Sequence, residues 1–174
     1  EFEVCISNNA SNDNTEEIIN KNKSKINLKY NINKSNFGIP KNFLKVVSMA
    51  KGEYVWLIGD DDMLLPDTFK RLLPLVKKNK SIDFFYLNSY HIDLEFINSK
   101  EHPFNLRDLP ENMEPFSKEN ISRKLQFFDL INPKISFDFL GGMFLSLFRR
   151  QKWDENINVL NNDALESNIT FSHF

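Results

Sequence analysis

Three adjacent carboxylates, Asp60, Asp61 and Asp62, are the residues of this sequence whose type and spacing best suit chemistry. Neighbouring ionised carboxylates repel one another, so a sheet gains no stability from them. In an extended chain Asp60 and Asp62 point to the same side, about 6–7 Å apart. Carboxylate oxygens suit Mg²⁺ or Mn²⁺, which usually keep water and bind substrate phosphates. The cluster therefore predicts a divalent-metal site, and the alternative interpretation is a solvated acidic turn that caps the next helix.

The elements around the cluster alternate between strand and helix. The run just before it, 54–58, is continuously apolar, which is typical of a strand covered on both faces. Such alternation predicts an α/β protein with a mostly parallel sheet flanked by helices, which binds ligands at the carboxyl edge of its strands. The expected strands are 2–6, 26–30, 54–58 and 82–87, and the expected helices begin near residues 15, 40 and 66.

The second half of the chain has a different pattern. Residues 98–119 are polar and aperiodic, which predicts either a long loop that acts as a lid or specificity segment, or disorder. The other expected elements are an edge strand or hairpin arm at 90–97, a helix at 117–131 capped by Ser117, and short strands at 135–139 and 143–148 around Gly141-Gly142.

Composition narrows the class of protein. The 174 residues amount to one domain, and the net charge of −2 argues against a nucleic-acid partner bound by bulk positive charge. No apolar run is long enough to cross a bilayer, so we expect a cytoplasmic protein. The apolar and basic stretch 139–152 indicates a peripheral contact with the inner face of the cell membrane. The chain opens inside a strand and stops after a patterned segment, so we expect truncation at the N-terminus and at the C-terminus.

Three blocks together resemble glycosyltransferase family 2, whose fold is named GT-A. They are residues 3–15, the turn Asn36-Phe37-Gly38 with Asn42, and residues 52–62, which end in the acidic cluster. The order and spacing are similar to the family's, most of all to abequosyltransferase-like enzymes that build bacterial surface polysaccharides. The resemblance implies one GT-A domain over 1–174, with a nucleotide-sugar-binding half at 1–97 and an acceptor-side half at 98–174.

The resemblance also implies a reaction and a set of site residues. The reaction is metal-dependent, inverting transfer of a sugar from a nucleotide-diphosphate donor to a glycan or lipid-linked glycan acceptor, such as lipopolysaccharide or capsule. Asp62 would hold the Mn²⁺ or Mg²⁺, Asp60 would lie near the ribose or the metal, and Asp61 near the donor sugar or a metal-bound water. Inversion needs a general base, for which Asp163 comes first and Asp138 second. The other implied donor contacts are Asn8, Asn9, Ser11, Asp13, Asn36, Gly38 and Asn42.

Several alternatives stay open at this stage. The pair Asn8-Asn9 stands where the family usually has an aspartate, so the nucleotide base is open, and both residues also suit a turn. A catalytically silent nucleotide-sugar-binding domain is one alternative function, and a nucleotidyltransferase without a visible glycine-rich loop is another. Arg149 and Arg150 suit phosphates, or else the solvated end of a core strand.

Overall fold

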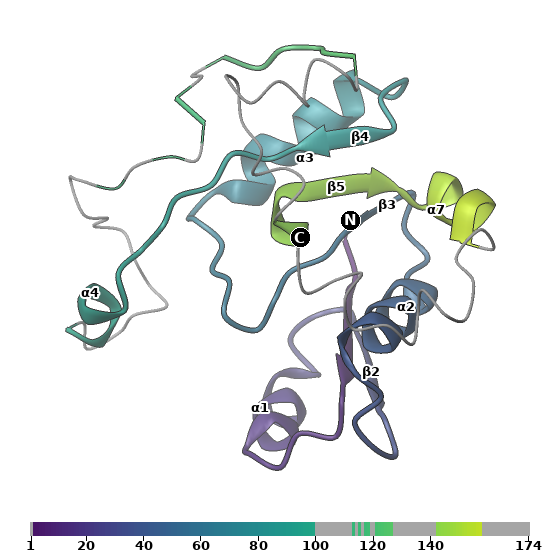
Figure 1. Ribbon diagram of the computed structural model, residues 1–174, viewed down its shortest axis with the longest axis vertical. Coiled ribbons are helices and arrows are strands. Elements are labelled where there is room, and N and C mark those ends of the chain that lie inside the picture. Colours follow the sequence, from purple (N-terminus) through teal and green to yellow (C-terminus); the bar gives the residue numbers. More distant parts are fainter. Residues whose placement is uncertain are drawn as a thin grey trace. The chain divides into compact units, whose positions relative to one another are not determined.

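A computed structural model describes residues 2–99, 113, 115, 117–118, 121–126 and 142–157 of the chain (Figure 1). The chain packs as two compact units. Unit 1 comprises Glu1–Val55 with Phe148–Phe174, and unit 2 comprises Trp56–Leu147. The division of one domain at residue 97 remains a prediction. Within the described ranges, no helix is long and apolar enough to cross a membrane.

Unit 1 contains the first two strands and the helices that follow them. β1 (Val4–Asn8) pairs in parallel with β2 (Leu28–Ile32), with Val4 opposite Leu28 and Asn8 opposite Ile32. Parallel neighbours need a crossover, which α1 (Thr15–Asn22) supplies. These elements agree with the expected strands and helix to within two residues. Because both strands run the same way, their carboxyl ends lie at one edge of the sheet.

α2 (Ile39–Met49) packs against β1 and begins at a glycine turn. Gly38 has a φ of 82°, which a residue without a side chain adopts most readily. Pro40 in the first turn suits the helix because its fixed φ is already helical, and both Pro40 and Val47 are buried. The expected helix start is therefore confirmed. α7 (Arg150–Asn156) completes the helices of this unit within the described residues.

The second sheet has the strand order β3–β5–β4. Its strands are β3 (Tyr54–Trp56), β4 (Phe84–Tyr86) and β5 (Ser146–Arg149). In unit 2, α3 (Thr68–Lys78) follows the acidic cluster, and Leu72, Phe85, Leu145 and Leu147 form a buried core. Trp56 donates from its indole N–H to the Phe144 carbonyl, and its ring meets Phe69 edge-on with centroids 6.2 Å apart.

Four expected elements differ from the structure. The strand expected at 54–58 ends at Trp56, and the strand expected at 143–148 is a short 3₁₀ turn (Met143–Leu145) followed by β5. Residues 90–97 are not a strand, because Asp93 accepts the Glu95 N–H and caps a short helix, α4 (Leu94–Asn98). The described part of 117–131 is not helical, since the Ser117 backbone pairs with the Asn88 side chain instead of starting a helix.

Glu3 ties the start of unit 1 to the segment that precedes β3. Its carboxylate forms an ion pair with Lys29 and accepts the backbone N–H groups of Lys51 and Gly52. The hydrogen bond from Lys29, followed by that from Lys51, lowers the pKa of Glu3 below 4.5. Its stabilising contribution is therefore complete above pH 4.5 and lost as pH falls through the lowered pKa.

We expect Glu3→Gln to lower the free energy of unfolding by about 1–2 kcal/mol at neutral pH, because the charge-assisted bonds are lost. The difference from wild type should shrink in acid, where the wild-type carboxylate is protonated. Urea titrations at several pH values measure it, with the exposed Glu17→Gln on α1 as the control. A difference in unfolding free energy between Glu3→Gln and wild type that does not change with pH would contradict a stabilising role of the ionised Glu3 carboxylate.

Candidate functional site

Asparagine side chains join the carboxyl ends of β1 and β2, and Asn33 lies at their centre. It follows β2 directly and is 7% exposed. Its Nδ2 donates to the Oδ1 atoms of Asn9 and Asn42, both at 3.0 Å, and its Oδ1 accepts from Asn31 at 2.8 Å. One buried amide is thus bonded to the side chains of three other asparagines. Sequence reasoning missed Asn33, which lies three residues beyond the strand expected at 26–30 and directly after the observed β2.

Asn42 connects α2 to the end of β1. Its Oδ1 accepts from the Ser7 hydroxyl at 2.7 Å, and its Nδ2 donates to the Ser7 carbonyl at 3.0 Å. With the bond from Asn33, the oxygen of this amide accepts two hydrogen bonds. The structure therefore gives Asn42, predicted as a donor contact, a positioning role between helix and strand.

The loop after β1 is held by two adjacent amides. Asn8 is 6% exposed, donates to the Tyr30 hydroxyl and accepts the Ser11 N–H at 2.7 Å, which closes the turn around Ala10. Asn9 reaches the β2–α2 segment instead, where it donates to Asn36 at 2.7 Å and accepts the Phe37 N–H at 3.0 Å. The pair shapes its own loop, as the turn interpretation expects, and also fixes the loop to the rest of the unit.

The remaining predicted residues of unit 1 divide into two groups. Asn36 accepts the Gly38 N–H at 2.9 Å in addition to the Asn9 amide, so the expected Asn-x-Gly turn belongs to the network. Asp13 is fully exposed, and its carboxylate accepts hydrogen bonds from the hydroxyl and the backbone N–H of Thr15. The hydroxyl bond, followed by the backbone bond, lowers the pKa of Asp13 below 3.8. Asp13 thus supports the start of α1, apart from the network.

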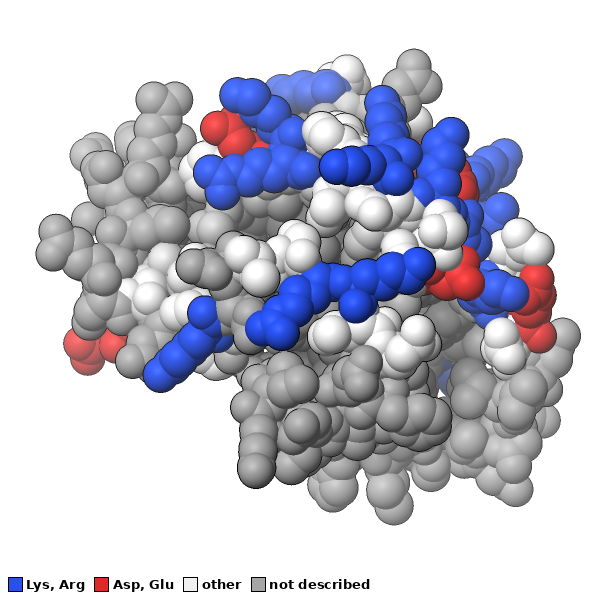
Figure 2. Space-filling view, turned by 90° about the horizontal axis from the view of Figure 1, so that it is seen from above, with Lys and Arg blue, Asp and Glu red and all other residues white. Residues whose placement is uncertain are grey.

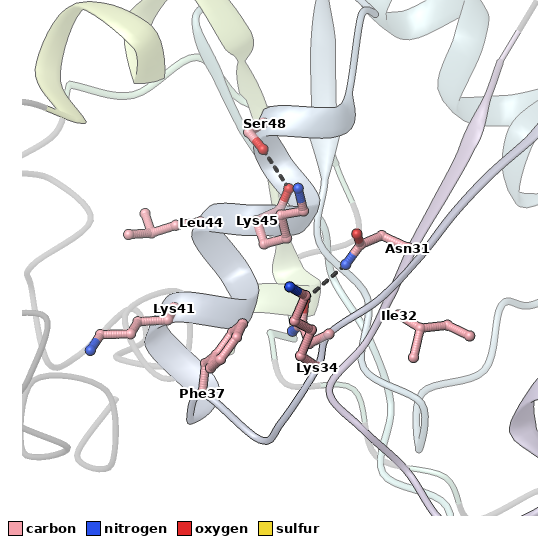
Figure 3. A pocket seen from close by; sticks show the side chains of 9 residues that line it. Asn31, Ile32, Lys34, Phe37, Lys41, Leu44, Lys45 and Ser48 are labelled. Carbon is pink, nitrogen blue, oxygen red and sulfur yellow. Dashed lines mark hydrogen bonds between the residues drawn. The ribbon is translucent and has the colours of Figure 1, made fainter.

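An open pocket of about 590 Å³ lies between β2 and α2 (Figure 3). Figure 3 shows Lys34 and Phe37, from the segment between the two elements, next to the helix that carries Lys41 and Lys45. Three lysines and no carboxylate line the pocket, so it suits an anionic group such as a phosphate. Asn33 both lines it and belongs to the network. The lining residues are Asn31, Ile32, Asn33, Lys34, Phe37, Lys41, Leu44, Lys45 and Ser48.

In unit 2, the acidic cluster forms a turn rather than an extension of β3. Asp60 and Asp61 occupy the turn, and Asp62 Oδ2 accepts the Gly59 N–H at 2.7 Å. A Cβ atom at position 59 would lie 2.5 Å from a side-chain oxygen of Asp61, so a larger residue there would push the Asp61 carboxylate aside. The expectation of an extended chain with Asp60 and Asp62 on one side is therefore wrong. The carboxylate of Asp62 accepts the Gly59 N–H, which would pair with a neighbouring strand if β3 were longer.

Burial, and then the charges of Asp61 and Asp60, raise the pKa of Asp62 above 3.8, against the effect of the Gly59 N–H bond. A cation beside Asp62 would favour the ionised form of its carboxylate. Carboxylate oxygens are the kind of ligand that Mg²⁺ or Mn²⁺ binds. In the turn, however, they do not converge: the described residues contain no group of three or more His, Cys, Asp or Glu arranged to hold a metal ion.

The acceptor-side predictions are described in part. Asp138, Asp163 and Gly141 lie outside the described residues. Gly142 is buried, and a Cβ there would lie 2.8 Å from Leu145, so this glycine makes room for the core and not for a substrate.

The two arginines at the end of β5 are engaged within unit 1. Arg149 pairs with Glu53 and lies over the Tyr54 ring, 4.7 Å from its centroid. Arg150 pairs with Asp154 and donates to the Gly52 carbonyl at 3.0 Å. These contacts agree with the alternative of a strand with a basic end.

Comparison with known proteins places this geometry in context. Residues 1–148 match the sequence model described as "Glycosyl transferase family 2". Abequosyltransferase RfbV of Salmonella typhimurium is 44% identical over 70 residues, which are 39% of this chain and 21% of that enzyme. Hyaluronan synthase of Pasteurella multocida is 34% identical over 96 residues, which are 53% of this chain and 10% of the synthase.

Among solved structures, S. aureus TarS 1-349 in complex with UDP has a TM-score of 0.65 at 20% identity, and the match covers 96% of this chain and 43% of that one. The same TarS fragment in complex with UDP-GlcNAc has a TM-score of 0.62 at 22% identity and is matched over 90% of this chain and 39% of that one. The chain spans less than half of the length of each of these proteins.

Proposed function

The chain belongs to glycosyltransferase family 2 and has the family's GT-A α/β fold, and on that premise we propose that it binds a nucleotide-diphosphate sugar and transfers the sugar to a bacterial surface glycan. The observation that carries the proposal is the asparagine network at the common carboxyl edge of β1 and β2. Ligands of open α/β sheets bind at this edge. The network holds two loops there in one arrangement before any ligand arrives, which reduces the entropy cost of binding.

UDP is the first nucleotide to test, because the similar TarS structures contain UDP and UDP-GlcNAc. Among the network residues, Asn36 is exposed and uses only its carbonyl oxygen in the hydrogen bonds found within the described residues. Its NH₂ group therefore keeps two donors for a ligand. We assign Asn36 and the backbone of the Asn9 loop to contact with the nucleoside, while Asn8, Asn33 and Asn42 position them.

The acidic turn of unit 2 is our proposed metal site, with Asp62 as the main ligand, Asp60 beside it, and Asp61 near the donor sugar or a metal-bound water. A bound Mn²⁺ or Mg²⁺ would neutralise the charge that develops on the leaving diphosphate. The turn must open for the carboxylates to converge, because Asp62 is bonded to Gly59 in the structure. Its raised pKa supports this role, since an adjacent cation relieves the repulsion between the carboxylates.

The finer details of the reaction are also proposals. Asp163, and next Asp138, is our candidate for the base that deprotonates the acceptor hydroxyl in an inverting transfer. A glycan or lipid-linked glycan on the cytoplasmic face of the membrane is the acceptor class. A nucleotide-sugar-binding domain without catalysis is the second candidate, and the pair Asn8-Asn9, in place of the family's usual aspartate, favours it.

Calorimetric titration with UDP, TDP, GDP and CDP, each with and without Mn²⁺, tests the proposal. We expect one nucleotide to bind best and Asn36→Ala to weaken it about 5- to 10-fold, the value of one or two hydrogen bonds. Asn20→Ala, at an exposed position of α1, is the matched control. Product analysis with the matching nucleotide-sugar then separates transfer from silent binding. Folded protein that binds none of the four nucleotides would contradict both candidates.

A further inference from the structure

The outer face of α3 carries four basic residues. Lys70, Arg71, Lys77 and Lys78 are exposed, and they recur seven residues apart on the side opposite the buried Leu72. No acidic residue occurs within the helix, and the nearest acids are Asp67 before it and Asp83 beyond Lys80. Because the whole chain has a net charge of −2, this concentration of positive charge is local. Figure 2, seen from above relative to Figure 1, shows more Lys and Arg than Asp and Glu among the described residues on that face.

A second segment of unit 2 combines positive charge with exposed apolar side chains. Residues 121–126 form no helix or strand, and Ile121 is 64% and Leu125 is 39% exposed. The exposed Arg123 and Lys124 lie between these two residues, and Lys118 precedes them. This segment and α3 both belong to unit 2. Large apolar side chains next to lysine and arginine, without a covering partner in the described residues, are typical of an interfacial surface.

We propose that these two elements form one docking surface that holds unit 2 on an anionic lipid bilayer. The docking surface comprises α3 residues 70–78 and segment 121–126. Clusters of four to eight Lys and Arg residues on an amphipathic helix are attracted to acidic lipid headgroups, with each residue contributing about 5-fold in affinity at low salt. Ile121 and Leu125 would enter the boundary between headgroups and acyl chains.

The apolar residues favour a bilayer over a soluble polyanion. A nucleic acid or an anionic glycan pairs with the charges but offers no apolar phase to Ile121 and Leu125. A bilayer satisfies both parts of the surface at once. This inference is independent of the proposed donor site, because the residues of the docking surface are separate from the asparagine network and from the acidic turn.

Vesicle sedimentation tests the inference. The probes are vesicles of phosphatidylcholine with one third phosphatidylglycerol, and vesicles of phosphatidylcholine alone, at low and at physiological salt. We expect binding to the anionic vesicles only. Lys77→Glu/Lys78→Glu should lower it at least about 10-fold, and Ile121→Ser/Leu125→Ser should lower it about 5- to 30-fold. The control Lys21→Glu/Lys23→Glu makes the same charge change at the end of α1 and should have little effect.

Melting temperature and nucleotide binding, measured on every variant, show that the fold is retained. Equal binding to both kinds of vesicle would overturn the inference, and so would an equal loss in the control variant. Binding to a duplex DNA or to heparin that depends on Lys77 and Lys78 but not on Ile121 and Leu125 would replace the bilayer by a soluble polyanion. Wild-type protein that stays in the supernatant with anionic vesicles at low salt would also overturn it.

Discussion

Asp62→Asn should abolish the Mn²⁺-dependent part of nucleotide binding, with a loss of at least about 100-fold in affinity. The substitution keeps the size of the side chain and an oxygen that accepts the Gly59 N–H, so the turn is retained. What it removes is the charge that would hold the cation. Calorimetry with UDP and Mn²⁺ measures the loss. The control is Asp67→Asn, an exposed position in the same unit whose φ of 62° asparagine tolerates well.

The pH dependence of Asp62 gives the same prediction a second readout. Because its pKa is raised in the folded state, folding is favoured by protonation of this group: the contribution is complete below pH 3.8 and lost as pH rises through the raised pKa. Without metal, Asp62→Asn should therefore melt at or above the wild-type temperature at neutral pH. Added Mn²⁺ should raise the melting temperature of wild type and of Asp67→Asn, but not that of Asp62→Asn. An unchanged response of Asp62→Asn to Mn²⁺ would exclude Asp62 as the metal ligand.

The fold was predictable where local pattern and packing agree. The family and its fold, expected from three short blocks, are confirmed. Pro40 after a glycine turn marks the start of α2, and the alternation in residues 26–30 marks β2 to within two residues. These signals are local, because a proline restricts its own φ and an alternating strand shows its own buried face.

The failures came where a side chain bonds to a backbone group that the expected element would have used. Ser117 was expected to cap a helix, but its N–H and carbonyl bond to Asn88, which is 29 residues away. Asp62 was expected to extend a strand and instead accepts the N–H of Gly59. Neither outcome has a periodic signature in the sequence, because each depends on which of several polar side chains bonds to a free backbone N–H in the folded structure.

For the candidate site, the sequence indicated which asparagines gather at the sheet edge but not how they bond to one another. Asn8, Asn9, Asn36 and Asn42 were all expected to contact the donor, and the structure bonds each of them to other residues of the network. Asn33 was not predicted, yet its buried amide bonds to three other asparagines, Asn9, Asn31 and Asn42. A sequence can indicate that amides gather at a sheet edge, but their division into binding and positioning residues depends on geometry that asparagine spacing does not encode.

Asn33→Asp should be the most destabilising single substitution in the network. The Nδ2 amino group, which donates two hydrogen bonds, becomes one carboxylate oxygen that faces the Oδ1 atoms of Asn9 and Asn42, both 3.0 Å from Nδ2 in the wild-type structure. Two hydrogen bonds are replaced by repulsion in a buried position, which costs about 2–4 kcal/mol. In a chain of this size the loss corresponds to a fall in melting temperature of roughly 5–15 °C. Thermal unfolding followed by circular dichroism measures it.

Asn36→Asp is the matched control, because Asn36 contributes only its Oδ1 acceptor to the network and a carboxylate can replace that oxygen. We expect it to change the melting temperature by no more than about 2–3 °C. The contrast between the two variants is the decisive result, since the chemical change is the same and only the direction of hydrogen bonding differs. Equal losses in both would mean that charge near the loop, and not the donors of Asn33, controls stability. We expect only Asn33→Asp to be destabilised, and to bind nucleotide more weakly even below its melting temperature. In that case the amide that orders the two loops also prepares them for the ligand. Stability and binding at this edge of the sheet then have a common origin.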